Sequence, residues 1–146
     1  MHLSRLTVVL VVSVAVSACH DSTAPFLRTY ALTAIDGQPL PVTFSAVDVG
    51  STVLSGTLYL DDAGHAFRVD RYRDWSANTP KTYERTERLN DGYRIANDSI
   101  SLGVFGCPNS CPGNEVGFFS DSALTLTPDV MPRTRPVYTY HVVNTL

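Results

Sequence analysis

Hydrophobic and polar residues alternate along most of this chain, and no long segment repeats its apolar residues with the 3.6-residue period of a helix. Residues 52–60, TVLSGTLYL, are a clear case, because Leu54, Leu58 and Leu60 fall on one face with Gly56 between them. β-Branched and aromatic residues dominate these alternating stretches, as is typical of strands. The pattern predicts an all-β protein.

Turn sequences divide the alternating region into short segments. Asp36-Gly37, residues 61–64 (DDAG), Asp91-Gly92 and Asn97-Asp98 each predict a turn. The strands expected between the turns are residues 26–35, 38–47, 52–60, 65–73, 81–89, 92–96, 99–105, 115–120, 122–128 and 136–143.

About eight to ten short, regularly spaced strands favour an up-and-down barrel or a sandwich over an α/β fold. Pro39 and Pro41 restrict the second segment to pairing at an edge or after Val42. A helical turn is conceivable only at residues 83–90. Gly56 on a core-facing position fits the bends that close a small barrel, and closure removes exposed strand edges. We therefore expect a small antiparallel meander barrel, with a β-sandwich as the second choice.

The N-terminal region has a different pattern. Arg5 precedes an almost wholly apolar run, residues 6–16. This run is too short to cross a bilayer, which needs ~20 helical residues, but it fits the apolar core of a signal peptide. The run ends in small residues that lead straight to a cysteine.

That ending, Val16-Ser17-Ala18-Cys19, resembles a bacterial lipobox. The resemblance implies a diacylglycerol on the Cys19 thiol, cleavage before Cys19 and acylation of the new amino terminus. Several acyl chains make a stable membrane anchor, whereas one chain holds a protein only marginally. A plain secreted protein is the alternative. His20, and not Asp, follows Cys19, which under the lipoprotein sorting pattern implies the outer membrane of the cell envelope.

The expected organisation is therefore a signal peptide (1–18), a lipidated cysteine with a short tether (19–25) and a single β-domain (26–146). The formal net charge is −3 and the charged residues are interspersed. Nothing resembles the basic patch of a nucleic-acid-binding protein, so no nucleic-acid partner is expected.

Residues 30–41 (YALTAIDGQPLP), the Gly56-x-Leu58-x-Leu60 stretch and residues 92–102 together resemble uncharacterised bacterial lipoproteins with a lipocalin-like barrel. In that family the first strand leads into an Asn/Asp-Gly-x-Pro-Leu-Pro turn. The similarity covers most of the mature chain, although residues 62–67 (DAGHAF) depart from the Asp-Gly-Thr-Phe-like pattern. The resemblance implies the fold and no activity.

Cys107 and Cys111 lie in the sequence GCPNSCPG. A redox pair would favour Cys-x-x-Cys at a helix start, and a zinc site would need two further ligands at suitable spacing. We expect a structural disulfide that pins a loop, worth only ~2 kcal/mol because the closed loop is short.

No sequence motif predicts an enzyme. His20, His65 and His141 are far apart in the chain and are expected to be surface residues, although His65 and His141 could meet across a barrel. Nucleophile, metalloprotease and phosphate-binding motifs do not occur. We expect no catalytic residues, no metal and no cofactor.

The stretch FRVDRYRDW is the strongest candidate for a ligand site. Strict alternation places five of its residues on one face: Phe67, Val69, Arg71, Arg73 and Trp75. If the two apolar residues point inward, both arginines do as well. With Trp75 and Tyr83 they would suit an anionic or carboxylate-bearing ligand, since arginine binds carboxylates and stacks on aromatic rings. The more ordinary interpretation is a solvated hairpin in which these arginines form weak ion pairs with the acidic residues of segment 83–89.

Two functions follow from these expectations. The first is non-catalytic binding of a small amphipathic or anionic ligand at the barrel mouth. The alternative is a structural or interaction module, with a solid barrel whose surface contacts envelope proteins, peptidoglycan or a hydrolase that it inhibits.

Tyr138 and Tyr140 share a face and are expected in the core or barrel wall. The residues expected inside favour a filled interior: Leu54, Leu58, Leu60, Phe67, Ile95, Ile100, Leu102, Leu124 and Leu126.

Overall fold

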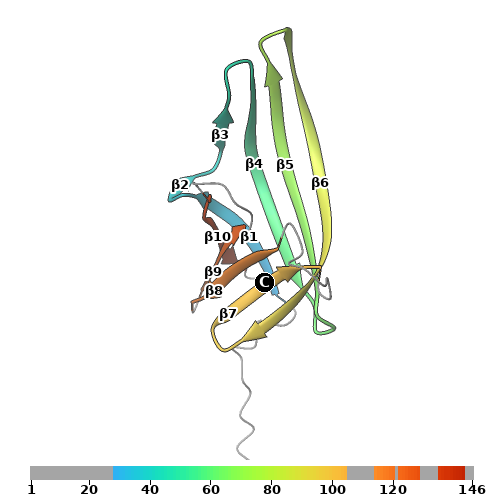
Figure 1. Ribbon diagram of the computed structural model, residues 1–146, viewed down its shortest axis with the longest axis vertical. Helices are drawn as coiled ribbons and strands as arrows, with labels where there is room; N and C mark the ends of the chain where they lie inside the picture. Colours follow the sequence, from blue (N-terminus) through green and yellow to red (C-terminus); the bar gives the residue numbers. More distant parts are fainter. Residues whose placement is uncertain (1–27, 105–113, 121, 129–134, 144–146) are drawn as a thin grey trace, which may run out of the picture.

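The computed structural model describes residues 28–104, 114–120, 122–128 and 135–143. All regular elements in these residues are strands of one antiparallel sheet (Figure 1). Within the described part of the chain there is no helix long and apolar enough to span a membrane. The strands are β1 (Arg28–Ile35), β2 (Gln38–Pro39), β3 (Val42–Ser45), β4 (Val49–Leu60), β5 (His65–Ser76), β6 (Thr79–Ala96), β7 (Ser99–Gly103), β8 (Glu115–Phe119), β9 (Ala123–Pro128) and β10 (Tyr138–Val142).

The sheet closes on itself through its first strand. β1 pairs with β10 along one edge and with β4 along the other, where Arg28 lies opposite Leu60. From β4 to β10 each strand pairs with the next one in the chain. The result is a closed antiparallel barrel of eight strands, β1 and β4 to β10, with β2 and β3 attached outside the ring. The expected small meander barrel of lipocalin-like type is confirmed.

One long strand replaces two expected segments. β6 runs without a break through residues 83–90, which confirms the strand expected there over the alternative of a helical turn, and through Asp91-Gly92, so the expected Asp-Gly turn is wrong. β6 changes partner at this point, because Gly92 pairs with His65 of β5 and also with Gly103 of β7. Ladder pairing on both sides keeps the backbone extended where the dipeptide alone favours a turn.

The other expected turns are present. Asp36 and Gly37 have φ angles of 51° and 75°, which fits the left-handed backbone of a two-residue hairpin. In the β4–β5 turn the Asp61 carboxylate accepts hydrogen bonds from the backbone N–H groups of Ala63 and His65. Asn97 has a φ angle of 56° in the β6–β7 turn. Short polar side chains tolerate this conformation and satisfy local backbone donors, which is why these positions turn.

Four strands continue beyond the ring. We call this part the extension: β3, residues 49–53 of β4, residues 72–76 of β5 and residues 79–85 of β6, which pair in that order. In Figure 1 these strands rise together well past the others. The extension ends in the β3–β4 and β5–β6 turns, while Arg28 and the β4–β5 turn lie at the opposite end of β4.

Apolar side chains from around the ring fill the barrel. A register shift between Val53 and Ser55 of β4 buries Val53 in place of Leu54, which is only half-buried. Tyr140 is buried and Tyr138 packs against the core, as expected. The buried cluster comprises Tyr30, Leu32, Ile35, Val53, Leu58, Leu60, Ala66, Tyr93, Ile100, Leu102, Leu124, Leu126 and Tyr140.

Candidate functional site

The inward face of β5 is not the face that its apolar residues suggest. Phe67 and Val69 are 40% and 39% exposed, so the expectation that Phe67 points inward is wrong. Phe67 contacts the Tyr59 ring on the outer wall, with 6.2 Å between centroids. The buried residues Leu58 and Leu60 of β4 pair with the intervening residues of β5, and this pairing directs Arg68 and Asp70 inward.

Arg71 and Arg73, the arginines singled out from the sequence, lie on the outer face. Both bind Glu84 of β6, with N–O distances of 3.2 Å for Arg71 and 2.8 Å for Arg73. All three side chains are about half exposed, so each ion pair contributes about 0–1 kcal/mol. This arrangement matches the solvated hairpin. Tyr83 pairs with Asp74 and therefore faces the opposite side of the sheet from these arginines.

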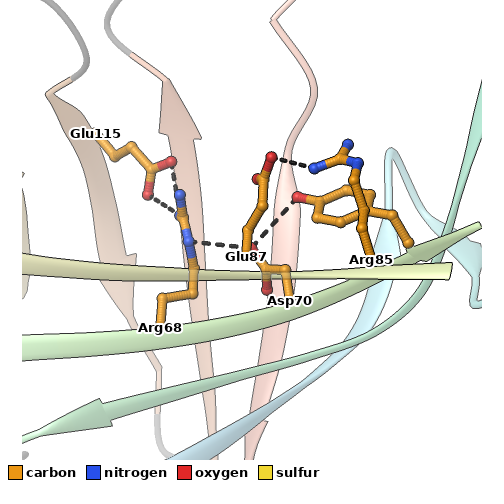
Figure 2. Close-up of polar contacts among 6 residues, drawn as sticks. Arg68, Asp70, Arg85, Glu87 and Glu115 are labelled. Carbon is orange, nitrogen blue, oxygen red and sulfur yellow. Dashed lines mark hydrogen bonds and ion pairs between the residues drawn. The ribbon is translucent and has the colours of Figure 1, made fainter. Parts of the chain in front are cut away.

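The inward-facing arginine of β5 is Arg68, and it bridges two strands that are not neighbours in the ring. Its Nη1 lies 2.7 Å from both carboxylate oxygens of Glu115 on β8 (Figure 2). Its Nε lies 3.2 Å from Oδ2 of Asp70, without hydrogen-bond alignment. Tyr72 donates its hydroxyl hydrogen to the same Asp70 oxygen at 3.4 Å. We call Arg68, Asp70, Tyr72 and Glu115 the interior cluster.

Burial and the contacts between its members together set the charge states of the interior cluster. Burial lowers the pKa of Arg68, but the attraction and hydrogen bonds of Glu115 outweigh burial, so the net shift is upward and the guanidinium stays charged. Burial raises the pKa of Asp70 more than the Arg68 charge lowers it. Gly56 makes room for this carboxylate, because a Cβ at that position would lie 2.6 Å from Oδ1 of Asp70. The positive charge of Arg68 therefore mainly neutralises Glu115 and neutralises Asp70 only in part.

We expect Asp70→Asn to raise stability at neutral pH relative to the parent protein. The pKa of Asp70 in the folded protein lies above its unfolded value of about 3.9. The carboxyl group therefore makes its full contribution to stability below about pH 3.9, and this contribution is lost as the pH rises through the folded pKa. Asparagine does not ionise, so the advantage of the variant should shrink as pH falls toward about 4. Urea unfolding midpoints across a pH series measure this difference.

Glu84→Gln is the control for that series. Hydrogen bonding to Arg73 lowers the pKa of Glu84, so its contribution is present above the unfolded pKa and is lost as pH falls. The two pH dependences should therefore have opposite signs. An Asp70→Asn advantage that does not change with pH would contradict the assignment.

The polar contacts continue from the interior cluster onto the extension. The Arg85 guanidinium lies 4.1 Å from the centre of the Tyr72 ring, and Tyr72 holds Asp70. Arg85 also donates from Nε to Asp74, 2.5 Å away, and from Nη1 to Glu87. Figure 2 shows Arg85 and Glu87 beside the interior cluster. A chain of charged and aromatic groups thus links the barrel interior to the extension.

A cleft of about 540 Å³ lies at the far end of the extension. Trp75, which the sequence indicated as a ligand residue, is part of its wall. The Trp75 indole also covers Gly50 of the neighbouring strand and occupies the space that a side chain there would need. The lining residues are Phe44, Ser45, Ala46, Val49, Gly50, Ser51, Asp74 and Trp75.

The other expected sites fare as follows. Among the described residues no three His, Cys, Asp or Glu side chains gather as metal ligands would. His65 and His141 are exposed, and His65 contacts Asp61 in the β4–β5 turn at 2.9 Å. Cys19, Cys107 and Cys111 lie outside the described residues, so the lipidation and disulfide expectations remain predictions.

The sequence indicated Trp75 but missed the interior cluster and the other cleft residues. A four-residue turn at 61–64 would place Leu60 opposite His65 and Leu58 opposite Phe67, which directs Phe67 inward. The structure instead pairs Leu60 with Ala66 and Leu58 with Arg68, so the hairpin is shifted by one residue and each side chain of β5 faces the other way. No signal in the sequence distinguishes these two registers.

The comparisons with known proteins gave no match to a protein-family model, a curated protein or a solved structure.

Proposed function

We propose that this protein is a lipid-anchored lipoprotein of the bacterial cell envelope, and that its filled barrel is a rigid support for a non-catalytic binding surface on the extension. The observation that carries the proposal is the separation of interior and cleft. Core side chains and the ion-paired interior cluster occupy the barrel, whereas the cleft lies at the far end of the extension. We therefore place the binding site at the cleft and not at the barrel mouth expected from the sequence.

A non-catalytic role fits the condition of the buried acids. Asp70 and Glu115 are two buried carboxylates that share Arg68 as their counter-charge. Both oxygens of Glu115 already accept hydrogen bonds from this arginine. A general acid or base must reach a substrate proton within hydrogen-bond distance. The cleft offers one carboxylate, Asp74, which already accepts hydrogen bonds from Ser51 and Arg85.

The position of the first strand supports the proposed orientation. Arg28 lies nine positions after Cys19, so a tether at Cys19 reaches at most about 30 Å. Arg28 pairs with Leu60, and the cleft lies near the other end of β4, which is 12 residues long. At about 3.3 Å per residue, β4 carries the cleft about 40 Å from the anchored end. The binding surface would thus point away from the anchoring membrane.

Cys19→Ser is expected to abolish lipid attachment. The thiol is the only acceptor that the lipobox resemblance provides, and without it no acyl chain is added. Labelling of cells with radioactive palmitate should show the parent protein labelled and in the membrane fraction, and the variant unlabelled. A variant that stays labelled would refute the lipid anchor, and Cys107→Ser serves as the matched cysteine control.

Photo-crosslinking in living cells tests the binding surface. A photoreactive phenylalanine analogue is placed at Val47, which is 94% exposed beside the cleft, or at Phe118, which is 65% exposed on β8 of the ring. We expect a reproducible adduct from Val47 and none from Phe118. Adducts only from Phe118, or from neither position, would refute binding through the extension.

The interaction module is the second candidate. The observation that favours it is the apolar tip around the cleft, where Phe44, Val47 and Val49 are exposed. Exposed apolar groups gathered at one end of a monomer often mark a protein contact. An adduct from Val47 with the mass of a second protein would favour this candidate, and a small mass increase would favour a ligand.

A further inference from the structure

The walls of the cleft are apolar and aromatic. Phe44 and Val49 belong to β3 and β4 and are 41% and 52% exposed, although both are large hydrophobic residues. The Trp75 indole lies over Gly50 on the neighbouring strand. The cleft volume of about 540 Å³ falls within the range of small-molecule sites, which is about 300–1,000 Å³.

The charged group in the cleft is a carboxylate. Asp74 accepts a hydrogen bond from the Ser51 hydroxyl at 2.6 Å and another from Nε of Arg85 at 2.5 Å. The hydrogen bond from Ser51, followed by that from Arg85, holds the pKa of Asp74 below its usual range, so the carboxylate is ionised at neutral pH. A carboxylate has about four acceptor positions, and these bonds use two of them.

The local charge balance is negative. Arg85 is shared between Asp74 and Glu87, so these three groups carry two negative charges and one positive charge. None of the eight lining residues is Lys or Arg. Asp48 adds a further acid in the β3–β4 turn next to the cleft.

We propose that the cleft binds a small amphipathic cation, a molecule with a compact apolar body and one amine or guanidine group. The apolar body would lie against Phe44, Val49 and the Trp75 indole. The cationic group would donate to Asp74 and lie near the indole face, which attracts cations. This inference rests on the proposed function, since it names the ligand class of the same cleft.

An anionic ligand fits the cleft less well than the cation. Arg71 and Arg73, the groups that would bind an anion, are not among the lining residues and both bind Glu84 on the outer face. An anion in the cleft would meet Asp74 with no lining cation to offset the repulsion. The sign of the ligand charge therefore distinguishes the two ideas.

Trp75 is the only tryptophan in the chain, so its fluorescence reports directly on the cleft. The protein used is the expected mature chain, residues 19–146, with Cys19→Ser, which carries neither the apolar N-terminal run nor the lipid and so avoids detergent. Three probes share a phenyl body and differ in the head group: phenethylamine (cation), 2-phenylethanol (neutral) and 3-phenylpropionate (anion). For molecules of this size we expect a Kd of about 1 mM for phenethylamine. One favourable charge contact should make it bind about tenfold more tightly than 3-phenylpropionate.

Three variants locate the effect. Asp74→Asn should remove the preference for the cation and leave 2-phenylethanol binding unchanged. Phe44→Ala should weaken all three probes alike, because it removes part of the apolar wall. Glu84→Gln is the matched control, since it removes a carboxylate from the outer face of the extension and should change nothing.

The proposal is overturned if 3-phenylpropionate binds as tightly as phenethylamine, if Asp74→Asn keeps the cation preference, or if no probe changes the fluorescence. These failures differ from a failure of the proposed function. An adduct at Val47 without cation binding keeps binding through the extension and rejects this ligand class. Cation binding without an adduct at Val47 supports the ligand class and rejects the proposed role in cells.

Discussion

Arg68→Met is expected to lower the free energy of unfolding by about 3–5 kcal/mol. Arg68 is the counter-charge for two buried carboxylates, and its removal leaves Glu115 and Asp70 inside the barrel without a cation. Methionine keeps most of the side-chain volume, so the loss measures charge and not a cavity. Urea unfolding followed by circular dichroism gives the free energy.

Arg73→Met is the matched control, because it removes an arginine of the same strand whose ion pair is exposed. Its expected cost is about 0–1 kcal/mol. A triple variant with Arg68→Met, Asp70→Leu and Glu115→Leu should recover much of the lost stability, since apolar residues often replace a buried ion pair without loss. If Arg68→Met costs no more than Arg73→Met, the interior cluster is not the buried ion pair described above.

Gly117→Ala is expected to destabilise the barrel by about 3 kcal/mol. Gly117 is buried on β8 opposite Leu126, where a Cβ would overlap the carbonyl oxygen of Thr125 and lie 2.8 Å from Cδ2 of Leu126. The carbonyl oxygen belongs to the backbone, so it cannot rotate away, and the β8–β9 pairing must shift.

The neighbouring substitution Val116→Ala provides the control for Gly117→Ala. Val116 is exposed on the outer face, and its truncation should change stability by about 0.5 kcal/mol or less. Unfolding midpoints compare the two variants. Similar midpoints would contradict the close approach of β8 and β9 at Gly117.

Local pattern and turn chemistry predicted much of the fold. Alternation placed Leu58 and Leu60 inside, and Asp36-Gly37 formed its turn because both residues accept positive φ angles. Asp91-Gly92 has the same chemistry and stays extended. Whether an Asp-Gly pair turns depends on partner strands on both sides, and these come from distant parts of the chain.

The candidate site was harder to predict because it depends on contacts across the barrel. Arg68 and Glu115 are 47 positions apart and lie on strands that do not pair. Phe67 and Val69 look like core residues, yet they lie on the outer wall because the hairpin register fixes the face of every residue in β5. The cleft required the ends of three strands to be placed together, which local pattern does not give.

Closure of the ring through β1 has a consequence for how the protein folds. β1 is the first described strand and pairs with β10 near the other end of the chain, so the seam forms between residues more than 100 positions apart. Such long-range pairing makes folding slow, because the loop entropy is lost before the contacts form. A chain synthesised from its N-terminus cannot complete the barrel until β10 has emerged. For the export proposed above this order is favourable, because the polypeptide stays unclosed, and able to pass through a narrow channel, until β10 has been made.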